Sequence, residues 1–113
     1  MKSKLELNAN MIWCVIVTVA HLQGRTITYE EVGDLTGINH RNLGKPLQMV
    51  ANYCEANKVP PITVLVVRKD TGVPSEGSEQ FGTKVPAEIF QLQQQVYAFD
   101  WRTFTKRVDL IAA

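Results

Sequence analysis

Apolar residues recur at steps of three and four in several stretches of this chain, which is the period of an amphipathic helix. The first stretch predicts a helix over residues 10–22, capped by Asn8 or Asn10 and ended by Gly24. The last predicts a helix over residues 87–99, with Pro86 suited to its first turn. The predicted inward positions of these two helices are Ile12, Val15, Ile16, Val19, Leu22, Ile89, Leu92, Val96 and Phe99, and the core is expected to be closed by Trp101, Phe104, Val108 and Leu110.

A short helix is predicted over residues 29–36. Thr28 and Glu31 fit the capping-box pattern, in which the threonine hydroxyl accepts from the third amide and the glutamate reaches back to the cap. Gly37 supplies the left-handed residue that ends this helix. Its predicted inward pair is Val32 and Leu35.

The next helix is predicted to start at Asn39 as cap and to serve as a recognition helix over about residues 39–48. Pro46 lacks an amide proton and should kink or split this helix near Asn42, so a second helical piece is expected to follow. Two helices joined by a Gly-containing turn make a helix-turn-helix. The predicted buried stripe is Leu43, Leu47, Val50 and either Tyr53 or Cys54.

The β-branched run over residues 62–67 predicts a buried strand. Turn residues follow at 70–72, so the chain is expected to reverse into a β-hairpin whose tip carries Arg68 and Lys69. Residues 75–83 are rich in Gly, Ser and Glu and predict a loop. The prediction is one α+β, mostly α domain over residues 1–113: a winged helix-turn-helix with a β-hairpin wing and a C-terminal helix.

The net charge of +1 conceals an uneven distribution along the chain. Residues 39–69, which hold the predicted recognition helix and wing, carry a net charge of +4, whereas residues 70–100 carry −4. The flanking segments carry −1 over residues 1–38 and +2 over residues 101–113. Because lysine and arginine bind nucleic acid by neutralising phosphates, this small basic surface predicts weak DNA binding.

Few residues indicate other chemistry. Cys14 and Cys54 fall within helical patterns and are predicted to be buried or half-buried, and His21 and His40 have no second ligand at metal spacing. No metal, cofactor or catalytic motif is therefore expected. The best apolar run, over residues 11–20, is shorter than the roughly 18 residues that span a bilayer, and no signal-peptide cleavage site follows it, so a cytoplasmic protein without membrane contact is expected.

Residues 11–77 resemble the DNA-binding domain of alkylguanine-DNA alkyltransferases and their non-catalytic alkyltransferase-like relatives, and the similar segments follow one another in the same order. Residues 24–32 are similar to the family segment Gly-x-Val-x-Thr-Tyr-Gly-x-Ile, and residues 39–47 are similar to the family's recognition helix. The resemblance implies that the ligand is duplex DNA, including duplex with a flipped or modified base. It implies that Arg41 fills the space of an extruded base and that Tyr29 lies near the target phosphate.

The resemblance also bears on catalysis. In the family segment Pro-Cys-His-Arg-Val-Val, the cysteine attacks the alkyl carbon and the histidine takes its proton. This chain has Ile62 and Thr63 at those positions, and the arginine is absent too. Cys54, the nearest cysteine, has no neighbouring histidine, so alkyl transfer to Cys54 or Cys14 is not expected. The prediction is a DNA-binding protein that is not an enzyme.

Exposed polar residues of the recognition helix and wing are the expected DNA contacts. Asn42 suits adenine, Arg41 suits guanine or a gap in the base stack, and Lys45 suits a phosphate. Three of these residues also have a purely structural interpretation. In it, Tyr29 packs at the rim of the core, Arg41 pairs with Glu30 or Glu31, and Lys69 serves only to keep the hairpin soluble. The complete predicted set is Tyr29, Asn39, His40, Arg41, Asn42, Lys45, Arg68 and Lys69.

The alternative function is a protein-interaction module that docks on a nuclease, on a component of a defence or anti-defence system, or on a second copy. The acidic residues 70–100 would then form the contact surface. Residues 60–67 and 96–101 resemble segments of small winged modules associated with bacterial and phage restriction or HNH-type nucleases.

Overall fold

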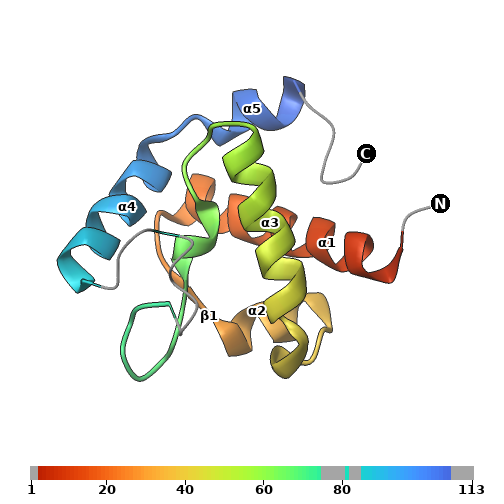
Figure 1. The fold of residues 1–113 in the computed structure, drawn as a ribbon. Coiled ribbons are helices and arrows are strands. Elements are labelled where there is room, and N and C mark those ends of the chain that lie inside the picture. The colour runs from red at the N-terminus through yellow and green to blue at the C-terminus, as the bar shows by residue number, and fades with distance from the viewer. Residues whose placement is uncertain (1–2, 75–80, 82–84, 108–113) are drawn as a thin grey trace.

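The structure, a computed structural model, describes residues 3–74, 81 and 85–107 (Figure 1). The chain is mostly helical with one small sheet, which confirms the α+β, mostly α class. In chain order the elements are α1 (Lys4–Thr18), η1 (Val19–Gln23), β1 (Ile27–Thr28), α2 (Tyr29–Thr36), η2 (His40–Asn42), α3 (Gly44–Ala56), η3 (Ile62–Leu65), β2 (Val66–Val67), α4 (Pro86–Ala98) and α5 (Trp101–Arg107).

The central helix is α1, which packs against α2, α3 and η3. Its inner face is fully buried through Ile12, Trp13 and Ile16. The predicted start of this helix was wrong, because Ser3 is the cap: its Oγ accepts a hydrogen bond from the Glu6 N–H at 3.1 Å. An N-cap serine satisfies a helix-end amide that would otherwise lack a partner, so the helix begins well before the residues predicted to cap it.

A π-helical turn, η1, continues α1 and ends at Gly24 as predicted. The Gly24 N–H donates to the Val19 carbonyl at 2.9 Å, and Gly24 adopts a left-handed conformation with φ of 57°. The predicted inward position of Leu22 was wrong, since 72% of this side chain is exposed. The i to i+5 pattern of a π turn rotates it away from the face that an α-helix would continue.

Together α1 and η1 form a helical stretch, Lys4–Gln23, that is 20 residues long and contains an 18-residue window with a mean hydropathy of 1.4. By length and composition alone this stretch meets the requirement for crossing a bilayer, a requirement that the core helix of a soluble protein also meets. In the structure its apolar inner face lies against the other helices.

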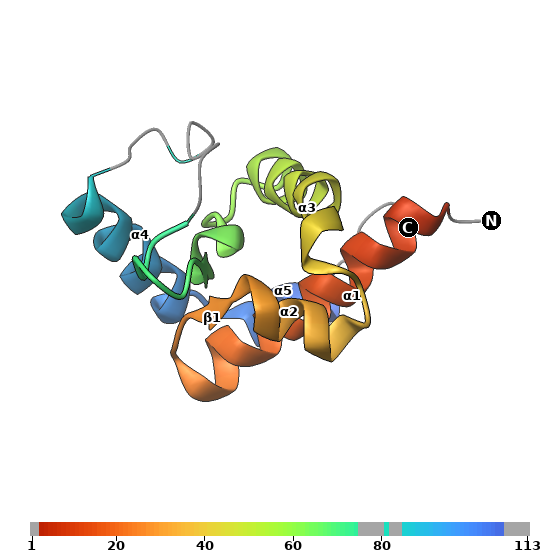
Figure 2. The same ribbon diagram turned by 90° about the horizontal axis from the view of Figure 1, so that it is seen from below.

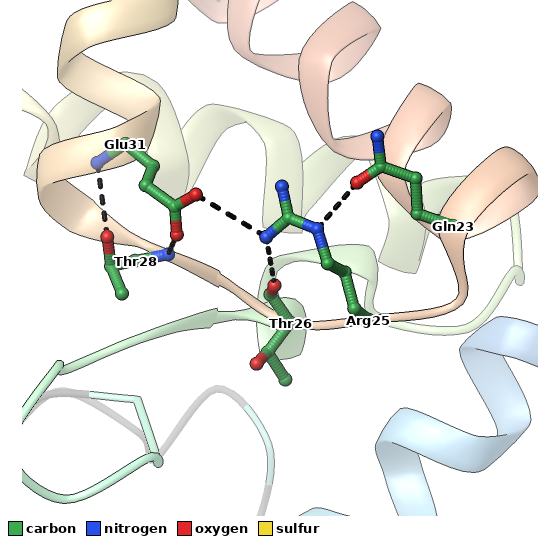
Figure 3. A network of polar contacts seen from close by, with 5 residues as sticks. All are labelled: Gln23, Arg25, Thr26, Thr28 and Glu31. Carbon is green, nitrogen blue, oxygen red and sulfur yellow. Dashed lines mark hydrogen bonds and ion pairs between the residues drawn. The ribbon is translucent and has the colours of Figure 1, made fainter.

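Thr28 and Glu31 form the predicted capping box of α2. The Glu31 N–H donates to Thr28 Oγ1 and the Thr28 N–H donates to Glu31 Oε1, both at 3.1 Å. Arg25 extends the network: its Nη1 donates to the Thr26 carbonyl at 2.9 Å and lies 3.4 Å from Glu31 Oε2, while its Nε donates to Gln23 Oε1 (Figure 3). These contacts connect the end of η1 with β1 and the first turn of α2.

The inner face of α2 differs from the predicted one. Val32 is fully buried as predicted, but Leu35 is 64% exposed. The second inward residue is Thr36, whose hydroxyl donates to the Val32 carbonyl at 2.7 Å and is thereby satisfied in the interior. Gly37 ends the helix in the left-handed conformation, as predicted.

The next predicted helix divides ahead of Pro46. Residues 40–42 form the 3-10 turn η2, and α3 starts at Gly44. Pro46 then lies in the first turn of α3, where backbone amides have no intrahelical acceptor, so its missing N–H costs no hydrogen bond. The predicted stripe is confirmed, with these residues buried: Leu43, Leu47, Val50 and Cys54.

The sheet is a short parallel pair in which Ile27 is opposite Val66 and Thr28 is opposite Val67. The predicted strand over residues 62–67 is buried throughout, but its first four residues form η3 instead. The chain reverses after β2, with the Arg68 N–H donating to the Val73 carbonyl at 2.9 Å, but the predicted β-hairpin is not found among the described residues, because β2 pairs in parallel with β1. In the described part of the chain β2 has no antiparallel partner, and the predicted loop 75–83 lies outside the described residues apart from Phe81.

The C-terminal helices complete the core. Pro86 begins α4 as predicted, and the buried Gln93 fixes α4 to η3 through a hydrogen bond from Nε2 to the Val64 carbonyl at 3.1 Å. Trp101 is fully buried, and its indole N–H donates to the Val96 carbonyl at 2.7 Å. Phe104 packs against this core, whereas Val108 and Leu110 fall outside the described residues.

Replacing Gly33 by alanine should destabilise the protein. An added Cβ would lie 2.9 Å from the Ile38 carbonyl oxygen, which is backbone and cannot move aside freely. Overpacking costs about 1–3 kcal/mol, and this outweighs the gain of about 1 kcal/mol in helix propensity. Urea unfolding should show a lower midpoint with an unchanged slope.

Gly44→Ala is the matched control, because no atom lies within 4 Å of an added Cβ there. Gly44→Ala should leave the free energy of unfolding unchanged or raise it by up to about 1 kcal/mol. Equal stability of the two variants would contradict the close packing at Gly33.

Glu31→Gln should destabilise the protein in a pH-dependent way. The Thr28 backbone N–H, with a contribution from Arg25, holds the pKa of the Glu31 carboxyl below its ordinary value. The resulting stability is fully present above the unfolded-state pKa of about 4.3 and is lost as the pH falls through the lower folded-state pKa. We expect a deficit of about 0.3–1 kcal/mol at pH 7 that shrinks at pH 3, measured by urea unfolding. A deficit of equal size at both pH values would show that the carboxylate charge has no part in it.

Candidate nucleic-acid interface

The residues predicted to contact DNA include a continuous exposed turn at the start of α3. Asn39, His40, Arg41 and Asn42 are all exposed. Among the described residues, Arg41 forms no ion pair with Glu30 or Glu31, since Glu31 pairs with Arg25 at 3.4 Å. The structure therefore does not support the alternative in which Arg41 only pairs with these carboxylates.

Three local features fix the backbone of this turn. Asn39 acts as the predicted cap, with its Oδ1 accepting from the Arg41 N–H at 2.9 Å, and its carbonyl accepts from the Asn42 N–H at 2.8 Å. Leu43, which follows the turn, is 1% exposed and anchors it in the core. On the other side, Gly33 of α2 lets the Ile38 carbonyl approach closely. The polar side chains are thus presented from a well-held backbone.

Between α2 and η2 lies a cleft of ≈ 650 Å³. Three of the predicted contact residues line it, namely Asn39, His40 and Arg41, and the carboxylates of Glu30 and Asp34 line it from α2. Those two carboxylates were not predicted as site residues, although their spacing of four places both on one face of a helix. The cleft therefore has an acidic wall and a cationic edge, so a phosphate is favoured at the Arg41 edge only.

Tyr29 and Lys45 occupy different environments. Tyr29, the first residue of α2, is half-buried and packs against the hydrophobic core, as its core-rim interpretation requires. Lys45 is exposed in the first turn of α3, directly beyond the exposed turn. Of these two residues, only Lys45 offers a charge to a ligand at the surface.

Arg68 and Lys69 are exposed in the turn that follows β2. Arg68 forms a two-point ion pair with Asp70, from Nε to Oδ1 at 3.0 Å and from Nη2 to Oδ2 at 2.8 Å. This pair was not predicted, though an arginine two residues before an aspartate at a turn is a signal that could have indicated it. The charge of Arg68 is consequently balanced by Asp70 within the turn. Among the described residues, Lys69 is the cation of this turn that pairs with no carboxylate.

The turn after β2 lies near the start of α2, because β2 pairs with β1, and the segment that joins η2 to α3 lies near the end of α2 (Figures 1 and 2). The structure thus brings Asn39, His40 and Arg41 together in one cleft and places Lys45 one turn further along. Arg68 and Lys69 form a separate group in the turn at the other end of α2.

The positions that resemble the catalytic pair of the alkyltransferases are buried. Ile62 is fully buried and Thr63 is 4% exposed. Burial raises the pKa of the Cys54 thiol to about 11, so this thiol is protonated and poorly nucleophilic at neutral pH. Cys14 was predicted to be at least half-buried and is instead exposed, because it lies on the solvent side of α1. No group of three metal-ligating side chains occurs among the described residues.

Comparison with known proteins adds no relative: no protein-family model, curated protein or solved structure matches this chain. The ligand of the candidate interface is therefore inferred from the geometry of its own residues.

Proposed function

We propose that the protein binds duplex DNA and is not an enzyme, with residues 39–48 as its recognition segment. The observation that carries this proposal is the exposed turn Asn39–Asn42, which is capped at one end and anchored by the buried Leu43 at the other. Such an arrangement directs four polar side chains outward while the backbone stays fixed, which lowers the entropy lost on binding.

The order α2, turn, η2 and α3 supports a helix-turn-helix mode of binding. In that mode the amino-terminal residues of the second helix meet base edges in the major groove. Arg41 and Asn42 are suited to guanine and adenine respectively, and Lys45 is suited to a phosphate. The acidic wall formed by Glu30 and Asp34 repels phosphates, so the DNA backbone is expected to pass on the α3 side of the cleft.

We propose that the turn after β2 acts as the wing of a winged helix of alkyltransferase-like type. Its exposed Lys69 is suited to a phosphate, and Arg68 can contribute once it exchanges Asp70 for a phosphate. The absence of catalysis is supported by the apolar Ile62 and the protonated Cys54 thiol. A base in contact with a nucleophile, which alkyl transfer needs, has no counterpart at Ile62 and Thr63.

Arg41→Ala should weaken binding to a labelled duplex at least about fivefold, because a base or stack contact made by arginine contributes about 1–3 kcal/mol. Fluorescence anisotropy at low salt measures this. For the wild-type protein, three or four phosphate contacts predict a slope of about −3 to −4 for log affinity against log salt.

Lys4→Ala is the control for that experiment, since it removes one exposed cation from the start of α1 and leaves the recognition segment intact. Its affinity should stay within about twofold of the wild type. Absence of binding at micromolar protein, or equal affinities of Arg41→Ala and Lys4→Ala, would refute the proposal.

Asp70→Asn should strengthen DNA binding at low salt. In the wild type Arg68 must exchange Asp70 for a phosphate, and the substitution removes this competition, so the affinity should rise by about 1.5- to fivefold, which corresponds to breaking one exposed ion pair. Glu55→Gln makes the same change in net charge near the end of α3, away from the proposed interface (Figure 1). An equal gain from both variants would indicate a general charge effect and would exclude a specific contact by Arg68.

The second candidate function, a protein-interaction module, is favoured by one observation. Leu7 and Met11 of α1 and Leu35 of α2 are 51%, 42% and 64% exposed, and α1 and α2 pack against each other. Exposed apolar side chains on adjacent helices suit contact with another protein. In a pull-down from the host lysate, nuclease treatment removes partners that are held only through DNA. A protein partner that is retained by the wild type after this treatment, and lost with Leu35→Ser, would identify this function.

A further inference from the structure

A second cavity, of ≈ 300 Å³, lies away from the candidate DNA interface. It is formed by the end of α1, the π turn η1 and the start of α5, and its lining residues are Val17, Thr18, His21, Leu22 and Arg102. None of these belongs to the predicted DNA-binding set. A volume of this size is at the lower end of the range for small-molecule sites, about 300–1,000 Å³.

The interior of this cavity is mainly apolar. Val17 and Leu22 line it with aliphatic side chains, and Leu22 is 72% exposed, although a leucine of this size is costly to leave in water. The hydroxyl of Thr18 donates to the Cys14 carbonyl at 2.7 Å, so its polar group is already satisfied within the helix. The cavity therefore favours an apolar group.

The π turn η1 forms part of the cavity wall. It ends at Gly24, whose N–H donates to the Val19 carbonyl, and its residues His21 and Leu22 lie beside Val17 and Thr18, four positions earlier on the same helix face. Single π turns cost helix stability and occur frequently at functional sites.

The rim of the cavity carries N–H donors. His21 and Arg102 line it from two different elements, and Arg102 is a permanent cation. Asp100 lies nearby, but its carboxylate accepts from the Thr103 N–H at 3.1 Å and from the Thr103 hydroxyl at 2.6 Å, as the cap of α5. Those bonds lower the pKa of Asp100, and the nearby His21 and Arg102 lower it further. A guanidinium has five N–H donors, so Arg102 can bind a ligand carboxylate in addition to its contacts within the protein.

We propose that this cavity binds a small apolar monocarboxylate. The aliphatic body of the ligand packs against Val17 and Leu22, and its carboxylate accepts hydrogen bonds from Arg102 and His21. A multiply charged anion such as phosphate suits the site less well, because most of the lining would face it with carbon atoms.

The test is a titration of the whole protein with sodium hexanoate, followed by amide chemical shifts, with 1-hexanol as the uncharged counterpart of equal chain length. Hexanoate should cause saturable shifts confined to residues 17–24 and 100–103. The affinity for hexanoate should exceed that for 1-hexanol by about three- to fivefold, the contribution of one part-exposed ion pair.

Two variants separate the apolar and ionic parts of the site. Arg102→Gln should lower the hexanoate affinity to that of 1-hexanol and leave 1-hexanol binding unchanged, whereas Leu22→Ser should weaken both ligands. Lys69→Gln removes a cation remote from the cavity and should change neither. Shifts that do not saturate, shifts scattered over the molecule, or equal hexanoate binding by Arg102→Gln and wild type would overturn the proposal.

Discussion

The burial of Trp13 is the interaction on which the rest of the fold depends. Its ring centroid lies 5.2 Å from that of Tyr53, 5.7 Å from Trp101 and 6.0 Å from Phe104, all with edge-to-face geometry. One side chain of α1 therefore contacts α3 and α5 at once. Each such aromatic pair adds about 0.5–1.5 kcal/mol to the stability gained from area burial. With α1 and α3 fixed in this way, Leu43 is anchored and the turn before it points to solvent.

Most helix ends are predicted well from the sequence, because their causes are local; the exception is the start of α1, where the cap is Ser3 and not Asn8 or Asn10. The capping box of Thr28 and Glu31, the left-handed Gly37 and the division ahead of Pro46 each depend on residues within one turn. Features set by distant neighbours were predicted less well. The parallel pairing of β1 with β2 and the exposure of Leu35 follow from packing between elements remote in sequence, whereas the exposure of Leu22 follows from the π turn η1.

The candidate site shows the same difference between features with a local cause, which the sequence predicts, and features that depend on residues remote in sequence. Exposure of residues 39–42 and of Lys45 follows from a polar segment at a predicted helix start, and the structure has them exposed. The partner of Arg68 and the position of Glu30 and Asp34 in the cleft depend on side-chain geometry and on how α2 faces η2. Charge counts along the chain assign +4 to residues 39–69, but the ion pair with Asp70 and the acidic wall reduce the positive field that DNA would meet. The proposed DNA binding is therefore expected to have a modest affinity and a modest salt dependence, because few phosphates are neutralised.

Amide chemical-shift mapping with an unlabelled duplex at low salt tests the central claim most directly, because it locates the contact surface residue by residue. The account predicts saturable shifts at Asn39–Lys45 and at Arg68 and Lys69, with the amides of α4 unchanged. Saturable shifts confined to α1 or α4, or no saturable shift anywhere, would contradict the claim that the turn before α3 is the DNA-binding surface.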